Sequence, residues 1–260
     1  MHNLLMKSFV TLVALTLVPG CSQRTPGGQT SAPKRMEQNE GVSAASEALG
    51  LDAVSQPERS HQRKVILRIP IISQKPELQN GCEVTSVAML LRYAGFNVGK
   101  MELSNQIPKD GDALRETRTG VITHWGNPNH GFVGDITGTA KGYAVYNKPT
   151  EQMMKRYLGK RTLNLTGSSF NVVLDQIKNN KPVVVWTTSH FSKPTKWVTW
   201  NHGKDKIKAT QEEHAVLVVG FDPHHVYVND PLTGKQALQV ARTPFIESWV
   251  ALGRQAVSYR

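Results

Sequence analysis

The stretch ELQNGCEVTSVAML (residues 77–90) joins a turn, a cysteine and the beginning of a helical pattern. Asn80 and Gly81 are a turn-favouring pair. After them, apolar residues recur at the spacing of an amphipathic helix: Val84, Val87, Ala88, Leu91 and Ala94. Gly95 is a stop signal. We therefore predict a helix that begins at Cys82 and ends near Gly95.

The start of this helix is a favourable place for a nucleophilic thiol. Unpaired backbone N–H groups and the helix dipole favour negative charge at a helix N-terminus. Gly81 also allows a substrate carbonyl to approach the Cys82 amide closely. We therefore expect the pKa of Cys82 to lie below the free-thiol value of about 8.5. The alternative is a small apolar residue that only begins a helix.

Residues 1–21 have the pattern of an export signal. Lys7 precedes the short apolar run FVTLVALTLV, and small residues lead to Cys21. The run is too short to span a bilayer as a helix. The sequence VPGC resembles the lipobox of bacterial lipoproteins, which implies an acylated Cys21 and a lipid-anchored, exported protein. The alternative is an ordinary secretory signal that is cleaved near Gly20 and leaves the protein extracellular.

Beyond the signal, the chain divides into a tether and one domain. Residues 22–64 are rich in Ser, Gln, Glu, Pro and Gly without a sustained apolar period, which is typical of a flexible linker. Residues 65–260 are long enough for one ordinary core and contain no internal repeat. If Cys21 is acylated or removed, Cys82 has no disulfide partner in a compartment that permits disulfides.

The chain is basic, with 31 Lys and Arg against 20 Asp and Glu, a net charge of +11. It has no dense basic run interleaved with aromatic residues, so we expect no nucleic-acid partner. A basic exported protein can instead contact anionic lipid or an anionic wall polymer. The alternative is a solvated basic surface without a partner.

Helical patterns dominate the first part of the domain and strand patterns the second. A β-branched run predicts a strand at 64–74, followed by a loop. The glycine-rich residues 110–146 predict a long irregular loop. Further helices are predicted near 101–107, 150–158, 168–178 and 244–252, and further strands at 181–191 and 255–259. This order predicts an α+β fold, with the cysteine helix packed on an antiparallel sheet.

The stretch EEHAVLVVGFDPHHVYVND (residues 212–230) predicts a β-hairpin with its turn near Pro223. Antiparallel pairing then places Asp230 opposite Val216 or Leu217, a few residues from His214. A cysteine nucleophile needs a histidine base whose ring is oriented by a third group, and this pair supplies both. Separately, each residue has a simpler interpretation, as a surface histidine and a turn aspartate.

The other histidines show no HExxH or comparable ligand spacing: His124, His130, His190, His202, His224 and His225. We therefore expect no metal site and no other cofactor. Four tryptophans are either core aromatics or part of a substrate cleft: Trp125, Trp186, Trp197 and Trp200.

Four segments in order resemble one known family: ISQKPELQNGCEVTSVAMLLRYAGF, GNPNHGFVGDITG, HAVLVVGFD and VYVNDPLTGK. They are similar to the exported branch of the bacteriocin-leader (double-glycine) peptidases, the thirty-ninth cysteine-peptidase family. The resemblance covers roughly residues 65–259 and implies a papain-like fold. It implies Cys82 as nucleophile, His214 as general base and Asp230 as the group that orients the base.

The resemblance also implies a glutamine upstream of the cysteine that helps to stabilise the oxyanion. Gln74 is our choice because it ends the predicted strand. Its distance from Cys82 along the chain exceeds the spacing in transporter-fused members, so Gln79 stays open. Glu83 and Thr85 match the family motif, but they can also simply favour the first helical turn.

These observations predict a cell-surface cysteine peptidase or amide hydrolase that acts on peptides or proteins outside the membrane. One alternative is a hydrolase of peptidoglycan stem peptides, similar in chemistry to the NlpC/P60 group. Those enzymes usually have a second histidine where this chain has Asp230. The other alternative is a papain-like module that binds peptides without chemistry.

Overall fold

The computed structural model describes residues 64–260. The predicted signal, the acylation site Cys21 and the linker up to residue 63 lie outside the described residues. No helix in the described part of the chain has the length and apolar character to cross a membrane.

The predicted cysteine helix is confirmed as α1 (Cys82–Tyr93), with Gly81 at its N-cap. Residues 82–91 are all buried, so the helix is packed on every side through most of its length. The other predicted helices are also present, with ends that shift by a few residues: α2 (Lys100–Gln106), α3 (Asn147–Leu158), α4 (Phe170–Lys178) and α5 (Arg242–Ala251). A short 3-10 helix, η1 (Gly159–Arg161), follows α3.

A seven-stranded sheet forms the centre of the domain, in the order β12-β11-β10-β7-β13-β6, with β1 paired to β10. All its pairings are antiparallel. Its strands are β1 (Val65–Ile66), β6 (Thr162–Asn164), β7 (Val183–Thr188), β10 (Glu213–Phe221), β11 (His225–Asp230), β12 (Lys235–Ala241) and β13 (Ala256–Tyr259). The predicted hairpin is confirmed as β10 and β11, and the α+β class is confirmed with it.

The strand predicted at 64–74 is much shorter than expected. After β1, the Leu67 N–H still donates to Val219 O at 2.7 Å. Pro70 has no N–H to donate, so the segment leaves the sheet edge and continues as extended chain toward α1. The Asn229 side chain donates to Ile69 O at 2.8 Å and holds the segment there.

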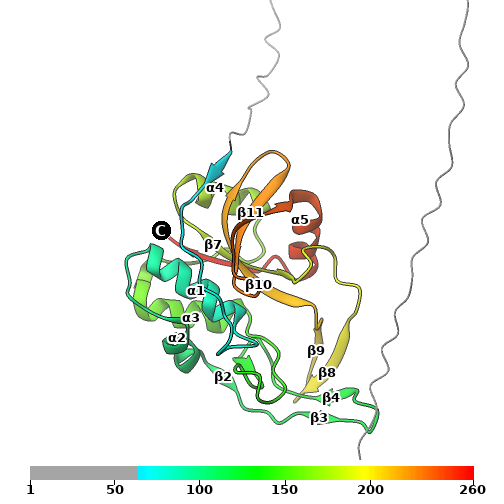
Figure 1. The fold of residues 1–260 in the computed structure, drawn as a ribbon. Coiled ribbons are helices and arrows are strands. Elements are labelled where there is room, and N and C mark those ends of the chain that lie inside the picture. The colour runs from blue at the N-terminus through cyan, green and yellow to red at the C-terminus, as the bar shows by residue number, and fades with distance from the viewer. Residues whose placement is uncertain (1–63) are drawn as a thin grey trace, which may run out of the picture. The chain divides into compact units, whose positions relative to one another are not determined.

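The helices cover both faces of the central sheet. Figure 1 shows α1 and α3 on one side of β7 and β10, and α4 and α5 on the other. On the second face, Phe170 of α4 and Trp249 of α5 lie with ring centroids 5.1 Å apart. The domain is therefore a three-layer arrangement of helix, sheet and helix.

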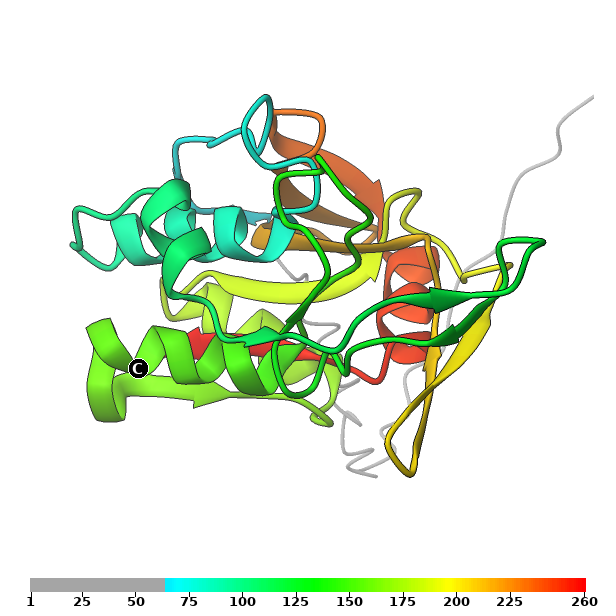
Figure 2. The ribbon, with the colours of Figure 1, turned by 90° about the horizontal axis from the view of Figure 1, so that it is seen from below.

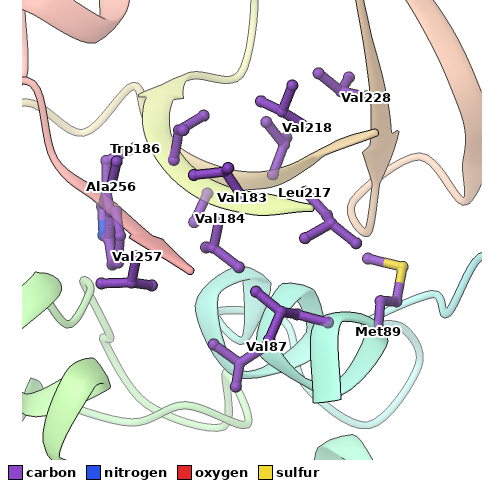
Figure 3. Packing of buried hydrophobic residues seen from close by; sticks show 14 of the residues in the cluster. Val87, Met89, Val183, Val184, Trp186, Leu217, Val218, Val228, Ala256 and Val257 are labelled. Atoms are coloured by element: carbon purple, nitrogen blue, oxygen red, sulfur yellow. The ribbon is translucent and has the colours of Figure 1, made fainter. Parts of the chain in front are cut away.

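The core forms because both faces of β7 and β10 are apolar. Val184 pairs with Leu217, and Val183 pairs with Val218. Successive strand residues point to opposite faces. In Figure 3, Val184 and Leu217 point toward α1, which carries Val87, whereas Val183 and Val218 point away from it. None of these five side chains is exposed, so the pairing of β7 with β10 fixes the sheet beneath α1.

Residues 110–146 are less irregular than predicted, because they contribute to two small sheets. One is the parallel pair β2 (Lys109–Asp110) and β5 (Phe132–Val133). The other has the order β3-β4-β8-β9 and consists of β3 (Arg115–Glu116), β4 (Ile122–His124), β8 (Val198–His202) and β9 (Asp205–Ala209). Figure 2 shows this four-stranded sheet extending away from the central layers.

Candidate active site

A cavity of about 120 Å³ lies at the N-terminus of α1, beside the start of β10. Its lining consists of Gln74, Gln79, Asn80, Cys82, Gly142, Tyr143, Gln211, Glu213, His214 and Leu232. The structure thus brings together the predicted nucleophile, the predicted base and both candidate oxyanion glutamines, which come from distant parts of the sequence.

His214 and Asp230 form a buried pair. The His214 Nε2 atom lies 2.7 Å from Asp230 Oδ1. Leu217 of β10 pairs with Asn229 of β11, so the register is the expected one. Since Nε2 faces the carboxylate, Nδ1 is the ring atom left for proton exchange with a thiol.

The Asp230 carboxylate is held by more than His214. Thr233 Oγ1 donates to Oδ2 at 2.6 Å, and the Leu232 N–H donates to Oδ1 at 3.0 Å. Burial acts to raise the pKa of Asp230, but the hydrogen bond and the charge of His214, with these two donors, bring that pKa below its ordinary value. Asp230 is therefore a fixed anion that can orient the His214 ring.

The Cys82 thiol is unpaired within residues 64–260 and only 6% exposed. Its Sγ atom lies 3.3 Å from Glu83 Oε2. Burial, followed by the nearby carboxyl groups of Glu83 and Glu213, raises the pKa of Cys82 well above its ordinary value. The expectation of a lowered pKa is therefore wrong for this conformation, because desolvation and two acidic neighbours outweigh the helix N-terminus.

Glu83 is more than a first-turn helix residue. It is fully buried, and its Oε1 atom accepts a hydrogen bond from the Val145 N–H at 2.7 Å. Burial raises the pKa of Glu83 to about 7 although this backbone N–H acts to lower it. Glu83 therefore links α1 to the segment before α3. Its carboxyl group, with a pKa of about 7, lies beside the Cys82 thiol.

Glu213 is the second carboxyl group near the Cys82 thiol. Its Oε1 atom is buried without a hydrogen-bond partner among the described residues. Ligand atoms of Cys82, Glu83 and Glu213 all lie within 4.8 Å of one another. Burial, with the charge of Glu83 as a second cause, raises the pKa of Glu213 well above its ordinary value. The neighbouring sequence EEH offered no sign of this, because Glu212 and Glu213 look alike as solvent-facing acids.

The two glutamines differ in their surroundings. Gln74 is 2% exposed, and its Nε2 atom donates to Gln79 O at 2.7 Å. The Gln79 side chain is exposed and donates to Pro76 O at 3.2 Å. An amide nitrogen has two hydrogens, so Gln74 keeps one donor for the cavity. Gln74 is thus the buried glutamine beside the cavity, and its role as oxyanion donor stays a prediction.

The glycine-rich motif GFVGDITG (residues 131–138) is hydrogen-bonded to the turn that precedes Cys82. Backbone N–H groups of Gln79 and Asn80 donate to Thr137 O and Ile136 O. The Asn80 side chain donates to Asp135 O at 2.8 Å. A Cβ atom at Gly142 would lie 2.1 Å from Asp135 O, so only glycine permits this approach. The motif thus holds the turn that presents Cys82.

Two larger hollows have lining residues in common with this cavity or with each other. One of about 580 Å³ shares Gln211 with it, and another of about 690 Å³ shares Trp197 with the first. Trp197 is 39% exposed and Trp125 borders the hollow of 580 Å³, whereas Trp186 and Trp200 are core residues. Two of the four tryptophans, Trp125 and Trp197, therefore line these hollows and two do not.

A helix that carries a cysteine, packed on an antiparallel sheet that carries histidine and aspartate, defines a papain-like α+β fold. The model of the Peptidase_C39 like family matches residues 66–257. Uncharacterized protein YvpB of Bacillus subtilis (strain 168) is 40% identical over 182 residues, 70% of each chain. A crystal structure of a protein from Bacillus anthracis, provisionally assigned as a C39-like peptidase, is 41% identical with a TM-score of 0.69. That match covers 76% of this chain and 98% of the Bacillus anthracis chain.

The chain belongs to the peptidase C39-like family, as its sequence motifs predicted. Membership in this family and the papain-like fold indicate a peptidase. The roles of the individual site residues stay predictions.

Proposed function

We propose that this chain is a cysteine peptidase whose triad is Cys82, His214 and Asp230. The observation that carries the proposal is the hydrogen bond of 2.7 Å between His214 Nε2 and Asp230 Oδ1, beside the cavity that Cys82 lines. A histidine oriented in this way can act first as a base and then as an acid.

In this mechanism the thiol begins protonated, since its pKa is raised. His214 Nδ1 accepts the thiol proton as Sγ attacks the scissile carbonyl. The developing oxyanion accepts hydrogen bonds from the Cys82 N–H, which has no acceptor within the helix, and from Gln74 Nε2. His214 then protonates the departing amine, and water hydrolyses the thioester with His214 again as base.

The proposed substrate is a peptide or protein met outside the membrane. Two hollows of about 580 and 690 Å³ support an extended substrate, because the first shares Gln211 with the cavity and the second shares Trp197 with the first. The proposed location rests on the sequence: an exported chain, anchored through Cys21, with a basic surface suited to an anionic wall polymer.

A module that binds peptides without chemistry is the second candidate function. The raised pKa of the buried Cys82 thiol favours it, because a thiol that keeps its proton is a poor nucleophile without an effective base. A hydrolase of peptidoglycan stem peptides would also be a cysteine peptidase of this kind, so it differs from the first proposal only in its substrate.

Digestion of two substrates tests these proposals. We would incubate the mature chain with a proteome-derived peptide library and with purified peptidoglycan, and would identify new amino termini by mass spectrometry. Cleavage that disappears in Cys82→Ala supports the peptidase, and the substrate that is cut separates general from wall peptides. Binding of peptides by both proteins, with no new termini from either, would establish the binding module instead.

Replacement of Asp230 tests the triad. Asp230→Asn keeps an oxygen that can orient His214, so kcat/KM is expected to fall by less than in Asp230→Ala, where we expect a loss of about 100-fold or more. Thr233→Val is the matched control, because it removes a donor to Asp230 and leaves the carboxylate in place. If Asp230→Asn and Asp230→Ala both keep the activity of the unmodified chain, another group orients the base.

A further inference from the structure

A cluster of histidine and aspartate side chains lies where the loop before β5 meets the end of β8. The His202 Nε2 atom lies 3.1 Å from Asp110 Oδ2, and His130 Nδ1 lies 3.8 Å from the same oxygen. Ligand atoms of these three residues are all within 4.8 Å of one another. None of the three borders the catalytic cavity.

Two further side chains surround this trio. Asp112 Oδ2 lies 3.4 Å from His202 Nε2. His124 Nε2 lies 3.2 Å from the same Asp112 oxygen. The cluster thus contains three imidazoles and two carboxylates, and Asp112 is in position to be a fourth ligand, with the His124 ring beside it.

The spacing of the ligand atoms suits a tetrahedral ion. Ligands that bind Zn²⁺ at about 2.0–2.1 Å lie about 3.3 Å from one another in a tetrahedron. The separations of 3.1, 3.4 and 3.8 Å that join Asp110, Asp112, His130 and His202 are near that value. Small side-chain rotations would be enough to close the site around one ion.

The backbone holds the Asp110 carboxylate in one orientation. The Asp112 N–H donates to Oδ1 and the Asn127 N–H to Oδ2, each at 3.1 Å. A Cβ atom at Gly131 would lie 2.5 Å from Lys109 C, so only glycine lets the His130 segment approach Asp110.

The composition of the cluster defines the class of ion. Imidazole nitrogens with carboxylate oxygens suit Zn²⁺ and other first-row transition ions, whereas Mg²⁺ and Ca²⁺ take oxygen ligands. Two carboxylates also match the charge of a divalent cation. We propose that Asp110, His130 and His202, with Asp112 as fourth ligand, form a binding site for a divalent transition-metal ion of the Zn²⁺ class.

Such an ion would join parts of the chain that are far apart in the sequence. Asp110 ends β2, His130 lies just before β5, and His202 ends β8. Since β8 belongs to the four-stranded sheet and β2 and β5 to the two-stranded one, the ion would cross-link the two small sheets. Metal binding to the folded chain would then raise its thermal stability.

Zinc titration of the untagged mature chain tests the proposal. The experiment uses Cys82→Ala protein, which removes the thiol beside Glu83 and Glu213 as a competing zinc ligand. We expect one Zn²⁺ per chain by calorimetry and a rise in melting temperature with zinc, whereas millimolar Mg²⁺ has neither effect. Absence of zinc binding at micromolar concentration would overturn the proposal.

Variants in the same background locate the ion. His202→Ala is expected to weaken zinc binding by at least tenfold, and His130→Gln does the same at a side chain that is 57% exposed and therefore safe for folding. His190→Gln is the matched control, because His190 pairs with Glu212 at 3.2 Å but belongs to no such cluster among residues 64–260. Equal zinc affinity in His130→Gln, His190→Gln and the parent would place the ion elsewhere and refute the site.

Discussion

At the scale of single residues, Cys82 holds its proton more firmly than a helix N-terminus predicts. Its thiol is buried and lies 3.3 Å from Glu83 Oε2. In our mechanism the thiolate is therefore not formed beforehand; Cys82 transfers its proton to His214 as it attacks. A bound substrate that moves the carboxyl groups of Glu83 or Glu213 would therefore change the pKa of the Cys82 thiol and its rate of attack.

Removal of the Glu83 charge tests this interpretation. Glu83→Gln keeps an oxygen for the Val145 N–H but removes a negative charge beside Sγ. We expect the pKa of Cys82 to fall and the rate of alkylation by iodoacetamide at pH 7 to rise about tenfold, as for a change of one pH unit. Mass spectrometry of the Cys82 peptide across pH 5 to 10 measures this.

The matched control is Glu77→Gln, which changes an exposed acid in the preceding loop. Its alkylation profile is expected to coincide with that of the unmodified chain. If Glu83→Gln also leaves the profile unchanged, the Glu83 charge does not raise the pKa of the thiol.

At the scale of elements, Glu83 makes the attachment of α1 dependent on pH. The pKa of Glu83 is about 7 in the folded chain, against 4.5 for an ordinary glutamate. Below pH 4.5 Glu83 is protonated in both the folded and the unfolded chain, and the free energy of unfolding has its full value. Between pH 4.5 and 7 the unfolded chain gives up this proton while the folded chain keeps it, so the free energy of unfolding falls, by about 3 kcal/mol in total.

Chemical denaturation at pH 5 and pH 8 checks this prediction. The unmodified chain is expected to lose about 2 kcal/mol more than Glu83→Gln between the two values, because the amide does not titrate. Parallel pH profiles for the two proteins would show that the Glu83 carboxyl stays solvated or ionised in the folded chain.

The contact between β10 and α1 is the second property at this scale. Leu217 is completely buried and faces α1 in Figure 3. Leu217→Ala is expected to lower the free energy of unfolding by about 3 kcal/mol, through lost burial and the cavity left behind. Met101→Ala, at a side chain that is 44% exposed, is expected to cost less than 1 kcal/mol. A similar cost for both would mean that this contact relaxes freely.

At the scale of the whole molecule, a basic catalytic domain is predicted to be tethered by lipid. The acylation site Cys21 lies outside the described residues, so this prediction rests on the sequence VPGC and the apolar run before it. Metabolic labelling with an alkyne fatty acid is expected to mark the full chain and to leave Cys21→Ser unmarked. Label that persists in Cys21→Ser, or fails to enter the full chain, would contradict the anchor.

The amino-acid sequence by itself determined the elements that carry the candidate triad. Local signals were sufficient to predict these elements. The helical spacing after Gly81 predicted α1, and two continuous apolar runs joined by a short turn predicted β10 and β11. The hairpin register also follows from local geometry, which is why Asp230 could be paired with His214 from sequence. The resemblance to the family added the prediction of an oxyanion glutamine, for which Gln74 was chosen.

Only the tertiary structure decided the environment of those parts. The carboxyl groups of Glu83 and Glu213 surround Cys82 because α1 packs against the start of β10, a long-range contact with no local pattern. Asp110, His130 and His202 have no ligand spacing along the chain, yet two small sheets bring them together. Local periodicity specifies helices and strands, whereas burial and charge depend on what other elements pack nearby, and these contacts set the pKa of the thiol and the proposed metal site.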